Sequence, residues 1–126
     1  YACGLDIKLI FTPHLVPMNR GIIATCYANL SKDISEEEIR DIYNKYYKDE
    51  KFVRVLDKGV VPETRFTKGS NYVDVNFFIE KRTNRLIMIG TLDNIVKGAA
   101  GQAVQNMNIL FGLEEDTGLN FVPSIV

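Results

Sequence analysis

The hydrophobic and polar positions at the start of the chain predict two strands joined by a loop. Residues 7–11 are mostly β-branched, aliphatic or aromatic, and the predicted strand stops at Pro13 because proline cannot donate to a strand ladder. After Gly21, residues 22–30 form a long, largely apolar run whose β-branched side chains favour a buried strand. We therefore expect residues 22–30 to lie centrally in a sheet.

A helix is predicted from residue 36 onward. Ser35 and Glu38 have the spacing of a capping box, and the three successive acids suit the positive end of the helix dipole. The apolar positions that follow have helical spacing and predict one buried stripe, formed by Ile39, Ile42, Tyr43, Tyr46 and Tyr47. The opposite face, which includes Arg40, is expected to be solvated.

Three further strands are predicted in the middle of the chain. Residues 52–56 form a short strand candidate, and residues 72–79 alternate apolar with polar side chains, as a half-buried strand does. A turn at residues 81–84 leads into the apolar run 85–92. The last two strands are expected to form an antiparallel hairpin.

The final element is a predicted helix over residues 93–111, with Asp93 as N-cap and Gly112 just past its end. Gly98 and Gly101 lie inside it, and each costs about 1 kcal/mol relative to alanine in a helix interior. We expect a close backbone approach to explain both glycines.

Together these elements predict an α+β fold with a mixed, mostly antiparallel sheet, in a single domain over residues 1–126. A chain of 126 residues, 46% of them hydrophobic, suffices for one core and is too short for two.

Charge and composition restrict the partners. With 15 basic and 16 acidic side chains, the chain lacks the basic surface that binds nucleic acid or an anionic membrane. Its apolar runs fall short of the roughly 20 residues of a membrane span. Cys3, Cys26 and the single His14 have no metal-ligand spacing, so no metal site is expected. We therefore expect small-molecule or protein partners, and a reducing cytoplasm as the location of the protein.

Candidate chemistry gathers in the connection between the first two predicted strands. This loop contains His14, Arg20 and two prolines that restrict its backbone, which suits a site that must hold a base in place. From the residues alone, His14 is either an acid–base group or a structural histidine. Arg20 is likewise either an anion clamp or a solvated arginine.

Two other segments are weaker candidates. The start of the last helix, residues 93–105, offers unpaired amides and small side chains, which suit either a ligand or tight helix packing. Residues 68–71 have the composition of an ordinary loop before a strand.

Taken together, these segments resemble the N-acetyl-γ-glutamyl-phosphate reductase family over essentially the whole chain. The resemblance rests on three strings in this order and spacing, FTPHLVPMNRG, GSNY and DNIVKGAAGQAVQNMN. It implies a two-domain enzyme of arginine biosynthesis with a Rossmann domain for NADPH. The second domain is implied to be α+β, like the C-terminal domain of glyceraldehyde-3-phosphate dehydrogenase, with helices packed on one face of its sheet.

The resemblance also assigns roles to single residues. In the family a cysteine thiolate forms a thioester with the substrate acyl group, and hydride from NADPH then releases the semialdehyde. His14 falls on the catalytic histidine of this mechanism, and Asn94 on a position that approaches the nicotinamide. Arg20 is carried over as a contact to the substrate anion.

The nucleophilic cysteine and the Rossmann fingerprint of the family have no match in these residues. Neither Cys3 nor Cys26 stands in the family's Gly-Cys motif. The chain is therefore expected to be cut in front and complete at its end, inactive alone and without bound NADPH. In the full enzyme it would supply His14 and the subunit interface of a homo-oligomer, either a dimer or a tetramer. The alternative is a self-standing dimerisation domain without catalysis.

Overall fold

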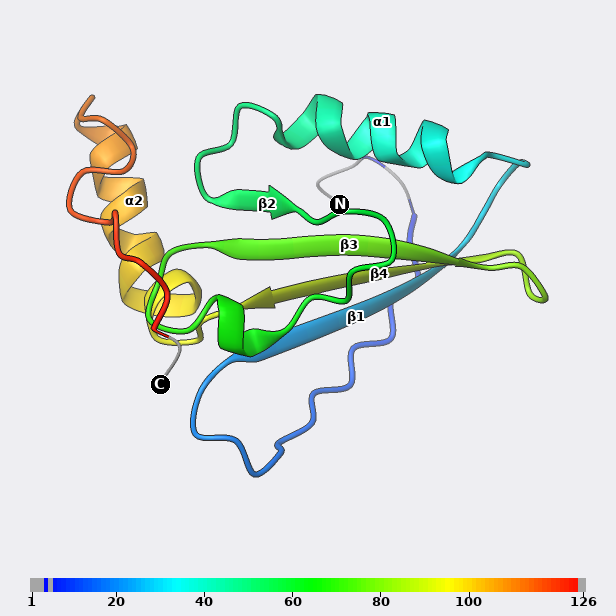
Figure 1. Cartoon of the computed structure of the whole chain (residues 1–126), viewed down its shortest axis with the longest axis horizontal. Coiled ribbons are helices and arrows are strands. Elements are labelled where there is room, and N and C mark those ends of the chain that lie inside the picture. The colour runs from blue at the N-terminus through cyan, green and yellow to red at the C-terminus, as the bar shows by residue number, and fades with distance from the viewer. Residues whose placement is uncertain (1–3, 5, 125–126) are drawn as a thin grey trace.

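The computed structural model describes residue 4 and residues 6–124 of the chain. Its elements follow in the order β1 (Ile22–Asn29), α1 (Glu36–Tyr47), β2 (Val53–Val55), η1 (Thr64–Phe66), β3 (Val73–Glu80), β4 (Arg85–Leu92), η2 (Val96–Ala100) and α2 (Gly101–Leu110). The four strands form one sheet in the order β1-β4-β3-β2, antiparallel except for the parallel pair β2 and β3. α1 lies along the sheet and α2 stands beyond one end of it (Figure 1). The predicted α+β class is confirmed.

β3 and β4 form the predicted antiparallel hairpin, and this hairpin lies at the centre of the sheet. It pairs Val73 with Leu92 at its open end and Glu80 with Arg85 beside the turn. The turn includes Asn84, the one non-glycine residue with positive φ among those described. Asparagine tolerates that left-handed conformation better than most side chains.

The α1 capping box is confirmed: the Glu38 N–H donates to Ser35 Oγ, and the Ser35 N–H donates to the Glu38 carboxylate. Ile39 is buried, and the Tyr43 ring lies 5.0 Å from the Phe77 ring on β3. The prediction of one fully buried stripe is wrong, because Ile42, Tyr46 and Tyr47 are exposed. α1 packs near β2 and β3, and this contact covers only part of its apolar stripe.

Arg40 corrects a second expectation for α1. It is half-buried rather than solvated, because its guanidinium donates to the Leu56 carbonyl and to Asn76 Oδ1. The same group lies 4.9 Å from the Phe77 ring centroid. Arg40 therefore ties the helix to the sheet, a role that its helical position alone did not indicate.

β1 is an edge strand, which contradicts the prediction that it lies centrally. It pairs with β4 on one side only, and all eight of its residues are exposed. Cys26, expected to be buried, is exposed as well. The apolar run did predict a strand correctly, but the side chains of this strand stay exposed in the described part of the chain. Cys3 lies outside the described residues.

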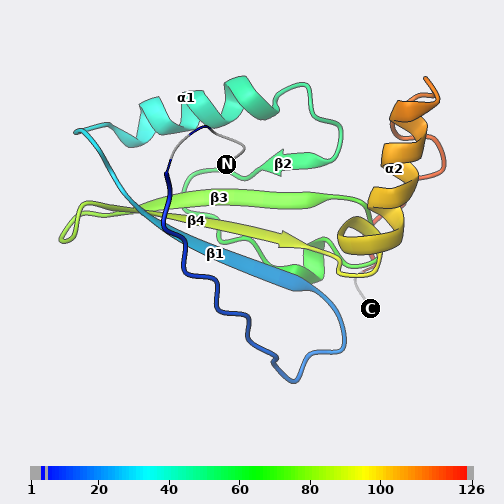
Figure 2. The same ribbon diagram turned by 180° about the vertical axis from the view of Figure 1, so that it is seen from behind.

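Residues 7–11 do not form the predicted strand. They form an extended segment that crosses in front of the strands in Figure 2 without pairing with them, and the side chains of Leu9 and Ile10 are 80% and 90% exposed. Their composition favours a strand, yet a strand also needs a neighbour for its backbone groups, and none is found among residues 6–124.

The last helix forms as predicted, with an unexpected first turn. Asp93 accepts hydrogen bonds from the backbone N–H groups of Ile95 and Val96, and a π-helical turn, η2, precedes α2. A Cβ at Gly101 would lie 2.7 Å from Val96 Cγ1, and one at Gly98 would lie 3.2 Å from Leu92. Close approach therefore does explain both glycines. Within the described residues no helix is long and apolar enough to cross a membrane.

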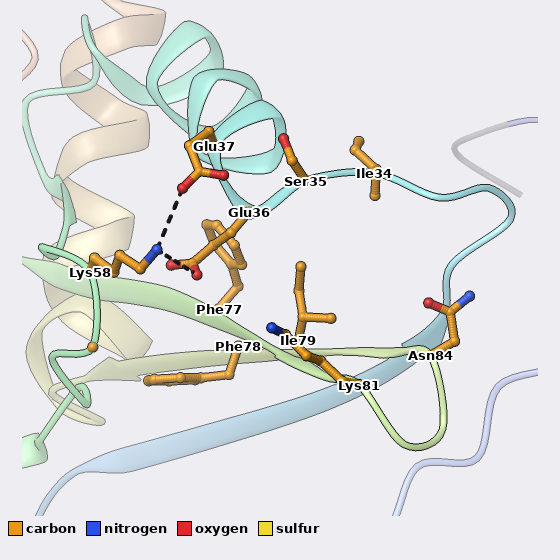
Figure 3. Close-up of a pocket in the computed structure, with 11 residues that line it drawn as sticks. Ile34, Ser35, Glu36, Glu37, Lys58, Phe77, Phe78, Ile79, Lys81 and Asn84 are labelled. Carbon is orange, nitrogen blue, oxygen red and sulfur yellow. Dashed lines mark hydrogen bonds and ion pairs between the residues drawn. The ribbon is translucent and has the colours of Figure 1, made fainter.

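The two faces of the sheet are covered differently. Phe77 and Ile79 point towards α1, whereas Phe78 points to the opposite side (Figure 3). By strand register, apolar side chains of β1 and β4 lie on the same side of the sheet as Phe78 of β3. We call this group the open sheet face, and it consists of Ile23, Tyr27, Phe78, Ile87 and Ile89. Tyr27 is 66% exposed there.

Candidate functional site

The loop between residues 12 and 21 brings one of its two candidate residues to the end of the sheet. Arg20 lies beside Asp93, where β4 ends and the last helix begins. His14 is exposed, and its Nδ1 lies 3.1 Å from the carbonyl oxygen of Thr12 in the same loop. Within the described residues no hydrogen bond or ion pair joins His14 to Arg20 or Asn94. The structure thus brings together Arg20 and Asn94, and it leaves His14 apart.

Asp93 is the centre of this arrangement. Its side chain is fully buried, and Oδ1 accepts from the N–H groups of Ile95 and Val96 at 2.8 and 2.9 Å. Oδ2 accepts from the Gly69 N–H at 2.6 Å and lies 2.7 Å from Arg20 Nε in an ion pair. One carboxylate therefore joins three segments that are far apart in the sequence.

These contacts keep Asp93 ionised. Burial acts to raise the pKa of Asp93, but the hydrogen bonds from Gly69, Val96 and Ile95, with the guanidinium of Arg20, outweigh it. The net result is a pKa below the usual value for an aspartate. The site consequently holds a fixed negative charge beside the Arg20 cation at neutral pH.

Asn94 holds the residue next to Arg20. The Gly21 N–H donates to Asn94 Oδ1 over 2.8 Å, so two consecutive loop residues bind two consecutive residues at the helix start. The Asn94 side-chain Nδ2 forms no hydrogen bond within the described residues. It remains a donor for a ligand.

Sequence reasoning missed the roles of Asp93 and Gly69 in this site. Asp93 was expected only to cap the helix, which needs one carboxylate oxygen, and the second oxygen goes to Gly69 and Arg20. The loop around Gly69 was expected to be ordinary. The sequence did contain one signal for the ion pair between Arg20 and Asp93. An acidic residue directly precedes Asn94, and the loop contains a cation, Arg20.

A second polar cluster contacts the last helix around Gln105. Gln105 Oε1 accepts from Asn71 Nδ2 and from Lys97 Nζ, while Gln105 Nε2 donates to the Glu115 carboxylate. Burial lowers the pKa of Lys97, against the opposing effect of Glu115. The Lys97 Nζ also lies 5.5 Å from the Phe52 ring centroid. Asn71 Oδ1 is buried without a hydrogen-bond partner, and the other contacts of the cluster hold the helix in place.

A groove of about 590 Å³ opens between the start of α1 and the end of β3 (Figure 3). Lys58 reaches across it and pairs with Glu36 at 2.9 Å and Glu37 at 3.5 Å. Hydrogen bonding to Glu36 raises the pKa of Lys58. Three of its charged side chains, Lys58, Glu36 and Glu37, are thus paired with one another, and the groove includes none of the predicted site residues. Among residues 6–124, no group of histidine, cysteine and acidic side chains is arranged to hold a metal ion.

Three relatives that are similar over nearly the whole chain are N-acetyl-gamma-glutamyl-phosphate reductases. That of Lachnospira eligens is 68% identical and covers 98% of this chain, and that of Lachnoclostridium phytofermentans is 63% identical and covers 94%. The Campylobacter jejuni reductase is 54% identical over 99%. The chain spans only 36%, 34% and 36% of the length of these relatives.

A solved structure supports the fold. Aspartate semialdehyde dehydrogenase II of Vibrio cholerae matches 77% of this chain and 29% of its own, with a TM-score of 0.61 and 21% identity. Residues 1–94 match the family described as semialdehyde dehydrogenase, dimerisation domain, and this match ends at Asn94, just before η2 and α2. The chain belongs to the semialdehyde dehydrogenase dimerisation-domain family.

Proposed function

We propose that this chain is part of an NADPH-dependent reductase that converts N-acetyl-γ-glutamyl phosphate to N-acetylglutamate semialdehyde and phosphate. The reaction belongs to arginine biosynthesis, and we place it in the cytoplasm. The observation that carries the proposal is a pair of contacts between the loop and the start of the last helix. Arg20 forms an ion pair with Asp93, and Gly21 hydrogen-bonds to Asn94. These contacts put a cation and a free amide donor together, in a chain 68% identical to a named reductase.

The substrate supplies anionic groups, and Arg20 is the residue proposed to bind one of them. Its side chain is 30% exposed, and its Nε forms an ion pair with Asp93. A planar guanidinium binds a carboxylate or phosphate through two parallel N–H donors. Arg20 therefore suits ground-state binding of the substrate.

His14 is proposed as the acid–base group of a thioester mechanism. The nucleophilic cysteine belongs to a part of the enzyme outside these residues. An imidazole beside that thiol would keep it deprotonated and would then donate a proton to the oxyanion. The exposure of His14 in this chain leaves its ring free to meet such a partner.

The residues at the helix start fit a nicotinamide cofactor. Asn94 is half-buried, its Oδ1 is held by Gly21, and its Nδ2 is left to donate to a carboxamide oxygen. NADPH, when bound, supplies the hydride that reduces the acyl group. Asn94 would orient the nicotinamide end, and the rest of the cofactor would need the Rossmann domain expected elsewhere in the enzyme.

The open sheet face is proposed as the subunit interface of a homodimer. It places apolar side chains of β1, β3 and β4 in water, where a contiguous apolar patch is unfavourable. The family description as a dimerisation domain supports this assignment. The same face also supports the second candidate function, a dimerisation domain without catalysis.

The decisive experiment uses the full-length protein, purified with its natural upstream sequence. NADPH oxidation is followed with N-acetyl-γ-glutamyl phosphate and, separately, with β-aspartyl phosphate, because the solved relative acts on an aspartate semialdehyde. We expect turnover with the first substrate, little with the second, and none from residues 1–126 alone. Oxidation with neither substrate would favour the non-catalytic dimerisation domain. Turnover by residues 1–126 that survives Cys-to-Ser changes at positions 3 and 26 would contradict the composite site.

A further inference from the structure

We infer that Asp93 is a positioning residue that holds the guanidinium of Arg20 through an ion pair at Nε and leaves the two terminal nitrogens to bind an anionic group of the substrate. The inference rests on the proposed function, in which Arg20 binds that anion. It adds a residue to the site and a physical reason for the orientation of the arginine.

The first observation is that the two carboxylate oxygens of Asp93 have different partners. Capping the last helix occupies Oδ1, which accepts from Ile95 and Val96. Oδ2 has no part in that cap, and it contacts Gly69 and Arg20 instead. A residue needed only as a cap would not require a second buried oxygen, since serine and threonine cap helices as well.

The state of Arg20 is the second observation. Its Nε is buried and lies 2.7 Å from Oδ2 of Asp93 in an ion pair, although within the described residues the Nε–H makes no hydrogen bond. The terminal nitrogens form no hydrogen bond within the described residues either, and the side chain is 30% exposed. The ion pair therefore holds the Nε end of the planar guanidinium and leaves its outer pair of donors for a ligand.

A second arginine–aspartate pair in the same chain provides a contrast. Arg54 Nε lies 2.5 Å from Oδ1 of Asp74, which is also buried. There, however, Arg54 Nη2 donates to the Phe66 carbonyl, and the guanidinium stacks 4.8 Å from the Tyr72 ring centroid. The donors of Arg54 serve the fold, whereas those of Arg20 remain for a ligand. Asp74 is therefore a matched control for Asp93.

The test measures steady-state kinetics of the full-length reductase with N-acetyl-γ-glutamyl phosphate for D93N, R20A, the double variant D93N/R20A and the control D74N. In D93N the asparagine oxygen can still accept the hydrogen bonds of the helix cap. Its NH2 group, however, replaces Oδ2 and faces the Gly69 N–H and Arg20, which are both donors. We expect D93N to raise KM about tenfold, the effect of one charge-assisted hydrogen bond, with a smaller change in kcat. D74N should leave KM unchanged.

The double variant separates positioning from general stability. If Asp93 acts through Arg20, D93N adds no further rise in KM once Arg20 is alanine. Additive effects of the two changes, or a normal KM in D93N, would overturn the inference. If R20A itself leaves KM unchanged, the proposed role of Arg20 fails instead, so the two failures are distinguishable.

A further variant keeps the inference testable if D93N does not fold. Arg20→Lys leaves Asp93 and the helix cap intact and retains the positive charge. The lysine ammonium can pair with Asp93 or reach the substrate. It cannot do both through separate edges, because it lacks the planar pair of terminal N–H donors of a guanidinium. We expect R20K to have nearly the KM of R20A. A KM equal to that of the unchanged enzyme would show that this planar pair of donors is not needed.

Discussion

The backbone N–H of Gly21 donates to Oδ1 of Asn94 over 2.8 Å, across 73 positions of the sequence. Gly21 adopts φ +110°, which side-chain-bearing residues rarely adopt, and a Cβ there would lie 2.8 Å from Thr64 Cβ. The loop that carries His14 and Arg20 is therefore anchored at a point where only glycine fits.

Gly21→Ala should destabilise the protein through both backbone strain and collision with Thr64. We expect a loss of about 3 kcal/mol in the free energy of unfolding, measured by denaturant titration. Gly59→Ala is the matched control, because Gly59 also has positive φ but open space around it. It should cost only about 1–2 kcal/mol, for the strain alone. Equal losses would mean that the close approach to Thr64 is not important.

The two glycines of the last helix should respond differently to alanine. At Gly101 a new methyl group would meet Asn71 Oδ1 and the Val96 side chain and carbonyl, so we expect about 1–3 kcal/mol of destabilisation. At Gly98 the close approach is milder, because the nearest atoms are the flexible end of Leu92, 3.2 Å away, and the Asp93 carbonyl oxygen, 3.3 Å away. There the better helix propensity of alanine should keep the change within about 1 kcal/mol. Thermal unfolding of the two variants compares them directly.

Asp93 should make stability depend on pH. Its pKa is lower in the folded protein than in the unfolded chain, so its contribution is present above the unfolded pKa of about 4. That contribution is lost as pH falls through the folded pKa. The unfolding midpoint of the unchanged protein should therefore exceed that of D93N at pH 7, and the gap should narrow below about pH 4. Other carboxyl groups, such as Glu38, titrate in both proteins and cancel in the difference. A gap that widens towards acid would contradict the ionised state of Asp93.

Elements whose determinants are local could be predicted from the sequence. The capping box of α1 needs only Ser35 and Glu38, and the β3–β4 hairpin needs only alternation on either side of a turn. Positions that depend on distant partners were not predictable in this way. The apolar residues of β1 indicate burial, but the sequence pattern does not say which surface provides it. For the same reason the helical position of Arg40 predicts a solvated side chain, because its acceptor, Asn76 Oδ1, lies on the distant strand β3.

The candidate site was predictable in part. The family resemblance pointed to Arg20 and Asn94, and the structure joins the segments on which they lie. Local pattern could assign Asp93 only to the helix that follows it, because the Gly69 N–H and the Arg20 guanidinium come from elsewhere in the chain. His14 remains a prediction, since its proposed partner cysteine is outside these residues.

The open sheet face should mediate self-association. We expect the protein to sediment as a dimer at micromolar concentrations, and Tyr27→Lys to shift it towards monomer by placing a charge in the apolar patch. Tyr46→Lys on α1 is the control, because Tyr46 is similarly exposed, at 71% against 66% for Tyr27, but lies on the helix. Dissociation of both variants, or of neither, would place the interface elsewhere.

His14 and Arg20 should affect different kinetic constants in the full-length reductase. An acid–base group acts mainly as charge develops in the transition state and typically contributes ~10²–10⁴ in rate, so His14→Asn should lower kcat with little change in KM. An anion clamp already acts in the ground state, so Arg20→Ala should raise KM first, with a smaller fall in kcat from lost positioning. Thermal unfolding of both variants checks that the loop has not collapsed. Because His14 is exposed and its one hydrogen bond within the described residues is with Thr12, its replacement should leave the unfolding midpoint nearly unchanged. An unaltered kcat in the His14 variant would remove that residue from the mechanism.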